Sequence, residues 1–213
     1  MIITYHGAES FKVQYGDVVL AFNPLSKNSQ LKNTRFGADI ALITANHIDL
    51  NGVDSVTFGG KEPFVISGPG EYEYKGVLVH GFSSTTSYGG EAMGNTIYMV
   101  TLEGINLCFL GALDKKELPK EATEELEGID ILFVPVGGDG VLSPVDAYGL
   151  AVSLEPKIII PMHYGDVGAK NALSLFLKEG GVEKSAEEME KLTLKKKDFD
   201  GREGDIIVLK PLN

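Results

Sequence analysis

The amino-acid sequence predicts an α/β protein, built as a four-layer αββα sandwich of two mixed β-sheets flanked by helices. Three observations lead to this prediction. Short β-rich runs alternate with glycine-bearing turns over the first two-thirds of the chain, and helical patterns enter later. The run Ile40–Thr44 is continuously apolar, which is typical of a strand buried on both faces. Two such sheets bury their apolar faces best against each other, with helices outside.

The predicted strands follow period-2 or continuous apolar patterns bounded by turn residues. In order, they are Ile2–Tyr5, Ser10–Tyr15, Val18–Ala21, Ile40–Thr44, Ser55–Phe58, Phe64–Ser67, Tyr72–Tyr74, Val77–Gly81, Ile97–Leu102, Ile105–Leu110, Ile129–Val134, Lys157–Pro161 and Asp205–Leu209. Helical spacing of apolar residues, or a proline or serine at the start, predicts helices over Pro119–Glu127, Val145–Leu154, Val167–Lys178 and Ala186–Lys191.

Composition limits the classes of function. A chain of 213 residues with 43% hydrophobic content predicts a single domain over residues 1–213. The net charge of −11 argues against nucleic acid as a partner, because phosphate binding needs clustered cations. An apolar run of membrane-spanning length and a secretion signal are both lacking, so we expect a cytoplasmic protein without a membrane partner. The single cysteine, Cys108, excludes an internal disulfide and a thiolate zinc cluster.

Candidate functional side chains are scarce because the chain has only four histidines. His6 and His80 lie at strand ends, and we expect ordinary structural or surface roles for them. His47 and His163 each follow a buried strand, and Asp49 lies two residues after His47. Functional groups gather at such strand tips, so these three side chains are the candidate site.

Other features favour structural roles. The glycine-rich segments 67–70, 89–90 and 137–140 lack the Lys-Ser/Thr of a phosphate-binding loop, and we interpret them as tight turns. Cys108 lies in the apolar run Leu107–Leu110, where a buried and inert thiol is expected. The sequence has no Gly-x-Ser-x-Gly elbow, so a hydrolase triad of that type has no support.

Several segments, in this order along nearly the whole chain, resemble the metallo-β-lactamase superfamily, and within it the metal-dependent hydrolases related to ascorbate-6-phosphate lactonases. The segments are ITYHGAESFKV, ADIALITANHID, GPGEYEYKGV, GNTIY, LCFLGALD, IDILFVPVGG and EPKIIIPMHYG. The resemblance implies the αββα fold. It also implies a site for divalent metal ions, zinc above all, at the strand tips.

The resemblance further implies that most metal ligands of this chain are replaced. The superfamily loop His-x-His-x-Asp-His corresponds here to Ala45, His47, Asp49 and Leu50. The other ligand positions match Thr86, Phe109, Ala112, Asn23-Pro24 and His163. His47, Asp49 and His163 therefore remain as vestigial metal candidates, divided between the two metal positions. A catalytic zinc normally needs three protein ligands and a water.

Three hypotheses follow. The first is a non-catalytic binding or structural module, whose partner would be a small molecule, a protein or a second copy of the chain. The second is a hydrolase of esters, lactones or phosphodiesters that uses a single zinc or other divalent metal held by the remaining ligands. The third is a metal-independent hydrolase with His47 and Asp49 as a general-base pair.

Overall fold

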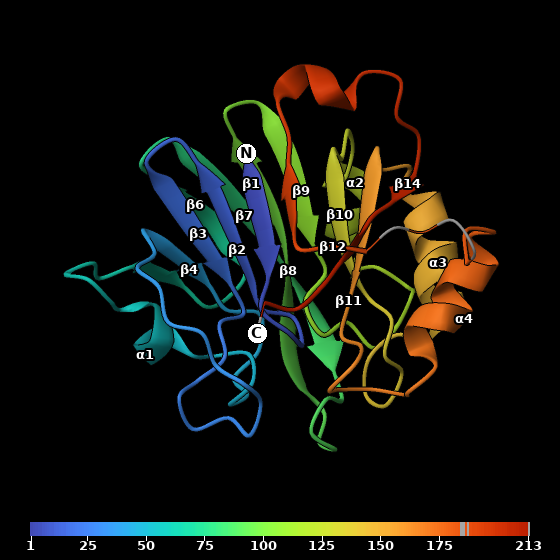
Figure 1. The fold of residues 1–213 in the computed structure, drawn as a ribbon, viewed down its shortest axis with the longest axis horizontal. Coiled ribbons are helices and arrows are strands. Elements are labelled where there is room, and N and C mark those ends of the chain that lie inside the picture. Colours follow the sequence, from blue (N-terminus) through green and yellow to red (C-terminus); the bar gives the residue numbers. More distant parts are fainter. Residues whose placement is uncertain (184–185, 187, 213) are drawn as a thin grey trace.

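Two mixed β-sheets form the framework of the protein in the computed structural model, which describes residues 1–183, 186 and 188–212 (Figure 1). The first sheet has the strand order β13 (Lys191–Thr193), β1 (Ile2–Tyr5), β2 (Phe11–Tyr15), β3 (Val18–Phe22), β4 (Ile40–Leu42) and β5 (Phe64–Ile66). The second has the order β14 (Asp205–Ile206), β11 (Ile158–Met162), β10 (Ile131–Pro135), β9 (Ile105–Phe109), β8 (Met93–Leu102), β7 (Val77–Thr86) and β6 (Gly70–Tyr74). A short parallel pair joins β12 (Glu188–Met189) to β15 (Val208–Leu209).

Both sheets combine antiparallel and parallel pairing. In the first sheet β1, β2 and β3 are antiparallel, and β3, β4 and β5 are parallel. In the second, β6 to β9 form an antiparallel meander, and β9, β10, β11 and β14 are parallel. The loops after β4 of the first sheet and β11 of the second both emerge at the lower end of the molecule in Figure 1.

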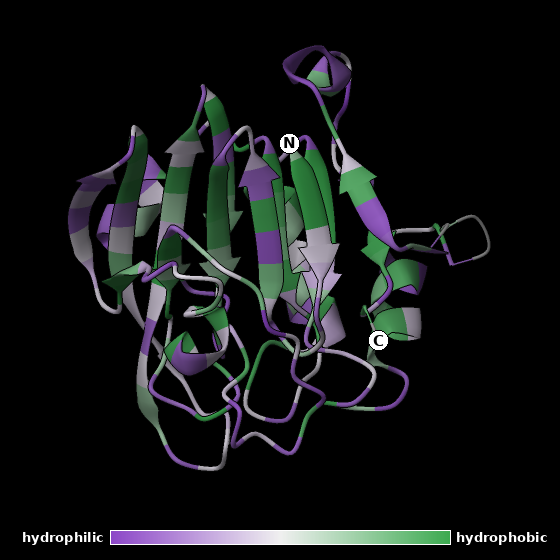
Figure 2. Ribbon diagram, turned by 60° about the vertical axis from the view of Figure 1, so that its left-hand side comes forward, coloured by the Kyte–Doolittle hydropathy of each residue, from purple (hydrophilic) through white to green (hydrophobic). Residues whose placement is uncertain are grey.

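The core lies between the two sheets and contains a cluster of phenylalanine rings. Phe22 of β3 stacks on Phe109 of β9 with ring centroids 4.8 Å apart, and Phe11 of β2 meets Phe133 of β10 edge-on, also at 4.8 Å. All four side chains are fully buried. Figure 2 shows hydrophobic residues along the strands of both sheets, with hydrophilic bands between them on several strands. These ring contacts hold one sheet against the other.

Helices cover the outer faces: α1 (Val53–Val56), α2 (Lys120–Glu125), α3 (Pro144–Ser153) and α4 (Ala172–Glu179). Buried side chains of α3 and α4, among them Leu150 and Phe176, join the core that includes the second sheet. Val56 of α1 packs against Val19 and Ala41 on the outer side of the first sheet. This arrangement confirms the predicted αββα class, with the short helix α1 over the first sheet. In the described part of the chain, no helix combines the length and apolar character needed to cross a bilayer.

Two predicted elements are wrong. Residues Ser55–Phe58 were predicted as a strand, but Ser55 and Val56 lie in α1, where the Thr57 N–H donates to the Val53 carbonyl and closes a single helical turn. The predicted helix Ala186–Lys191 contains β12 and the start of β13, with residue 187 outside the described residues. Pairing of Lys191 with Thr4 of β1 outweighs the local helical tendency of this charged segment. The helix predicted from Val167 begins later, at Ala172.

His6 is a structural histidine, as expected. Its side chain stacks on Phe36 at 5.3 Å, its Nε2 lies 3.2 Å from Thr4 Oγ1, and the residue is 6% exposed. Burial, with the nearby Lys12 charge second, lowers the pKa of His6 to about 4. His80 lies near the surface, where its Nδ1 pairs with Glu125 Oε2 at 2.8 Å.

The aromatic core predicts that two phenylalanine-to-alanine substitutions will lower the free energy of unfolding by clearly different amounts. Phe109→Ala removes a fully buried ring and leaves a cavity, so we expect the free energy of unfolding to fall by about 3–5 kcal/mol in urea denaturation. Phe58, which is 56% exposed, is the matched control. Phe58→Ala is expected to change the free energy of unfolding by roughly 0.5 kcal/mol or less. Equal effects at both positions would contradict the assigned core.

The lowered pKa of His6 predicts a loss of stability in mild acid. Between the unfolded pKa near 6.5 and the folded value of about 4, the unfolded chain binds a proton that the folded chain does not. Stability should therefore fall as pH drops through this window, by roughly 3 kcal/mol from this residue. His6→Phe keeps a ring against Phe36 but cannot titrate. Its urea midpoint should fall less between pH 7 and 4 than that of the wild type, and parallel curves would contradict the assignment.

Candidate functional site

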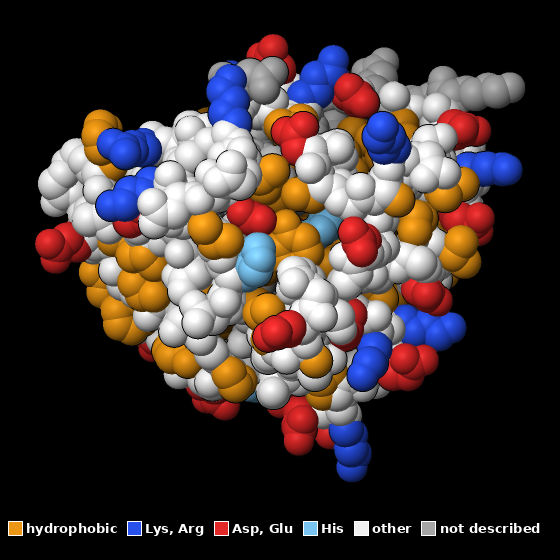
Figure 3. Space-filling model, turned by 90° about the horizontal axis from the view of Figure 1, so that it is seen from below, with side chains coloured by type: hydrophobic (Ala, Val, Ile, Leu, Met, Phe, Trp, Pro, Cys, Tyr) orange, Lys and Arg blue, Asp and Glu red, His pale blue; other side chains and the backbone are white. Residues whose placement is uncertain are grey.

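The candidate site lies where the loops after β4 and β11 meet the β1–β2 loop and the turn after β7. Figure 3 views this end of the molecule and shows histidine side chains surrounded by hydrophobic and acidic ones, with lysine and arginine towards the periphery. The charge around the site is therefore negative, which disfavours anionic ligands such as phosphate.

A single turn after β4 positions His47 and Asp49. The N–H groups of Leu50 and Asn51 both donate to the His47 carbonyl, at 2.9 and 2.8 Å, and wind the loop back on itself. The Asp49 N–H donates to His47 Nδ1 at 3.2 Å, and His47 Nδ1 lies 3.6 Å from Asp49 Oδ2. The two candidates predicted from sequence are thus neighbours, and each side chain is partly exposed.

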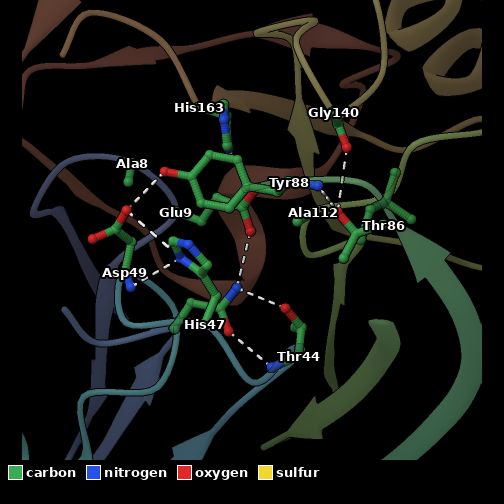
Figure 4. Close-up of polar contacts among 12 residues, drawn as sticks. Ala8, Glu9, Thr44, His47, Asp49, Thr86, Tyr88, Ala112, Gly140 and His163 are labelled. Atoms are coloured by element: carbon green, nitrogen blue, oxygen red, sulfur yellow. Dashed lines mark hydrogen bonds and ion pairs between the residues drawn. The ribbon is translucent and has the colours of Figure 1, made fainter. Parts of the chain in front are cut away.

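Tyr88 lies between the two candidate histidines, as Figure 4 shows. Its ring centroid is 4.7 Å from that of His47 and 4.7 Å from that of His163, with edge-to-face geometry in both cases. Its hydroxyl donates to Asp49 Oδ2 at 2.8 Å, and Ser29 Oγ donates to Asp49 Oδ1. Burial, followed by the hydrogen bond to Asp49, raises the pKa of Tyr88, so the phenol stays protonated and remains a donor.

His163 is fully buried and belongs to a hydrogen-bond network with Glu9. The His163 Nδ1–H donates to Glu9 Oε1 at 2.7 Å, and the His163 backbone N–H donates to the Ala8 carbonyl at 2.7 Å. Glu9 Oε2 accepts from Asn23 Nδ2 at 2.9 Å, and the same amide donates to Thr44 Oγ1 at 2.8 Å. Because Glu9 accepts the proton carried by Nδ1, the tautomer with a single proton on Nδ1 presents an Nε2 lone pair. Among the described residues nothing hydrogen-bonds to this buried nitrogen.

The backbone around His163 is specialised. His163 has a φ of 62°, a left-handed conformation that is uncommon for a residue other than glycine. Gly137 packs directly against it, because a Cβ at that position would lie 2.4 Å from the His163 carbonyl oxygen. Strained conformations of this kind persist only where surrounding contacts hold them, and here the Glu9 and Ala8 hydrogen bonds do so.

Three of the positions that the superfamily resemblance matched to lost ligands lie together in space. Ala45, Leu50 and Ala112 form one buried apolar cluster with Val141, and Tyr88 and Met93 pack against it. Thr86 is also buried, and its hydroxyl donates to the Gly140 carbonyl at 3.3 Å. Phe109, in contrast, belongs to the main core. Apolar side chains therefore fill this part of the site.

Sequence reasoning missed Glu9 and Tyr88, the two residues that decide the geometry. Glu9 stands alone among small residues in the turn between two strands, where a carboxylate has no local partner, and this was the available signal. Tyr88 follows the serine- and threonine-rich end of β7 and precedes Gly89-Gly90, with no pattern that points to its neighbours.

The donor set does not fit a metal ion bound by three protein side chains. Within residues 1–183, 186 and 188–212, no three His, Cys, Asp or Glu side chains are grouped to hold a metal. His47 and Asp49 are adjacent, but Tyr88 separates His47 from His163, and Glu9 is already bound to His163 and Asn23. Whether His47, Asp49 and His163 bind any metal stays a prediction.

The buried Glu9–His163 pair predicts a large and coupled effect of mutation. Glu9→Ala leaves His163 Nδ1–H and Asn23 Nδ2 without their shared acceptor, so the free energy of unfolding should fall by about 3–5 kcal/mol. His163→Ala and the double variant complete a double-mutant cycle in urea. We expect a coupling energy of about 1–3 kcal/mol, and strictly additive effects would contradict the pairing.

Comparisons with known proteins find a matching family model and similar relatives that share one name. A family model described as a beta-lactamase superfamily domain matches residues 2–163. A protein of Lysinibacillus sphaericus named a metal-dependent hydrolase is 28% identical over 195 residues, which cover 77% of this chain and 85% of that protein. A metal-dependent hydrolase of Anoxybacillus flavithermus is 26% identical over 197 residues, covering 77% and 86%.

Solved structures agree in fold. A crystal structure from Thermotoga maritima, described as a candidate zinc-dependent hydrolase of the metallo-beta-lactamase superfamily, superposes with a TM-score of 0.75 and 28% identity, over 98% of this chain and 97% of that one. A candidate metal-dependent hydrolase from Parabacteroides distasonis has a TM-score of 0.66 and 20% identity, over 99% and 93%. The family model spans residues 2–163, which include the strands and loops of the site. The chain therefore belongs to the family described as the beta-lactamase superfamily domain.

Proposed function

We propose that this chain is a member of the metallo-β-lactamase superfamily that has lost its metal pair and serves as a non-catalytic binding or structural module. The observation that carries the proposal is the position of Tyr88, whose ring lies between His47 and His163 and whose hydroxyl is bound to Asp49. A divalent ion shared by these three side chains would have to displace that ring.

The surroundings of Tyr88 support the proposal. Ala45, Leu50 and Ala112 make the adjacent space apolar, and an unpaired divalent cation is costly there. Asp49 directs its carboxylate to two hydroxyl donors, Tyr88 and Ser29, so both of its oxygens are engaged. Glu9 occupies Nδ1 of His163 and is itself held by the Asn23 amide, which donates to its other carboxylate oxygen. Hydrogen bonds and apolar contacts thus take the place of metal coordination.

A second candidate function has one observation in its favour. His163 Nε2 is buried with no hydrogen-bond partner among the described residues, and the relatives are named metal-dependent hydrolases. A hydrolase that holds a single ion through His163, His47 and Asp49, after movement of Tyr88, would use that nitrogen. Such an ion would polarise a carbonyl or phosphoryl oxygen of an ester, lactone or phosphodiester.

Metal analysis separates the two candidates. Protein purified without chelators and then titrated with zinc and manganese is expected to hold no stoichiometric metal by mass spectrometry. Stoichiometric metal that is lost on His163→Ala, with folding preserved by circular dichroism, would overturn the proposal and support the single-metal hydrolase. Surface binding that His163→Ala leaves unchanged would support neither a mononuclear nor a dinuclear site.

A restored variant provides the positive control. Ala45→His, Leu50→His and Ala112→Asp, combined with Tyr88→Gly, return donor atoms to the superfamily positions and remove the intervening ring. We expect this variant to bind zinc more tightly than the wild type, by about two orders of magnitude or more in dissociation constant. A folded quadruple variant with no gain in zinc affinity would show that the assigned positions do not converge on one site.

A further inference from the structure

The last strand of the second sheet, β6, has a free edge. It pairs with β7 from Gly70↔Gly81 to Tyr74↔Val77, and β7 lies between it and β8. Among the described residues, only those of β7 hydrogen-bond to the backbone of β6. An unpaired edge of this kind presents N–H and C=O groups that can extend the sheet with another strand. We propose that the free edge of β6 binds an extended segment of a partner protein in which Lys or Arg alternates with apolar residues.

The outer face of the sheet beside this edge is hollowed and acidic. Glu71 of β6 lies opposite His80 of β7, and Glu73 lies opposite Leu78, so both glutamates share the solvent face. A hollow of about 450 Å³ lies over this face, and Leu78 is 51% exposed in it. Glu125 of α2 adds a third carboxylate at the border through its bond to His80. Alkyl stems of lysine or arginine would lie over Leu78 while their charges reach the glutamates.

On the opposite face of β6, an added strand would contact aromatic rings, so apolar side chains fit there. Tyr72 and Tyr74 point to this side and are half-buried. Tyr74 stacks on Phe64 of β5 with centroids 4.9 Å apart and planes 13° from parallel. The Phe64 residue is 40% exposed despite this ring contact. Because side chains alternate along a strand, an added strand with cations on one face would place its other residues next to these rings.

Charge disfavours a second copy of this chain as the occupant. When two β6 strands pair antiparallel with their glutamates on the same face, Glu71 or Glu73 always faces a glutamate of the other copy. Like charges directly opposite each other on a sheet are destabilising. Lys75, at the turn after β6, does not relieve this, since it binds Asp39 at 2.7 Å. The same glutamates face opposite charges when the added strand carries Lys or Arg.

A designed peptide tests the inference on the whole chain. The probe is acetyl-Lys-Val-Lys-Val-Lys-amide, with binding followed by backbone amide shifts in NMR spectra. We expect the largest shifts at residues 70–74. Glu71→Lys with Glu73→Lys should weaken binding by about tenfold or more. The matched control, Glu155→Lys with Glu179→Lys, makes the same change of charge at exposed positions of α3's end and α4, and should leave the affinity unchanged.

Backbone methylation distinguishes strand pairing from simple charge attraction. The N–H groups of alternate residues in a strand point to opposite sides, so only one set can face β6. N-methylation of the lysines in one peptide and of the valines in another should abolish binding in one case and spare it in the other. Absence of binding, equal binding of both methylated peptides, or equal loss in the control variant would each overturn the proposal. Dimerisation of the free protein that depends on Glu71 would overturn it as well.

Discussion

The hydrogen bond between Glu9 and His163 joins the two sheets at the end of the molecule where the site lies. Glu9 follows β1 of the first sheet, and His163 follows β11 of the second. Both side chains are fully buried, so neither can lose its partner to water without a large free-energy cost. Asn23 and Thr44 extend the network to the ends of β3 and towards β4, and the tips of several strands are held in one arrangement.

Tyr88 depends on this arrangement because it packs against His163 on one side and His47 on the other. The hydroxyl of Tyr88 and that of Ser29 both donate to Asp49, which keeps the β4 loop in place. The apolar cluster of Ala45, Leu50, Ala112 and Val141 packs against Tyr88. A polar network, an aromatic ring and a small apolar cluster therefore fix the arrangement of these loops.

The site and the β6 edge place different demands on a ligand. At the site, the carboxylates of Asp49 and Glu9 are engaged by neighbouring side chains, and His163 Nε2 is buried without a hydrogen-bond partner among the described residues. At the edge, backbone groups of β6 face outwards and the carboxylates of Glu71 and Glu73 are exposed. In the proposed module, contacts with a partner would form at the sheet edge, while the strand tips provide rigidity.

The sequence by itself determined the fold class and the order of most strands, and it predicts that most superfamily ligand positions are replaced. Apolar runs such as Ile40–Leu42 and Ile158–Met162 identify buried strands because burial on both faces requires continuous hydrophobicity. Local pattern failed at Ala186–Lys191, where pairing with β1 outweighs helical tendency. Only the tertiary structure decided that Glu9 meets His163 across a separation of 154 residues, and that Tyr88 lies between two histidines. Such contacts depend on how the sheets pack, which no local spacing of residues encodes.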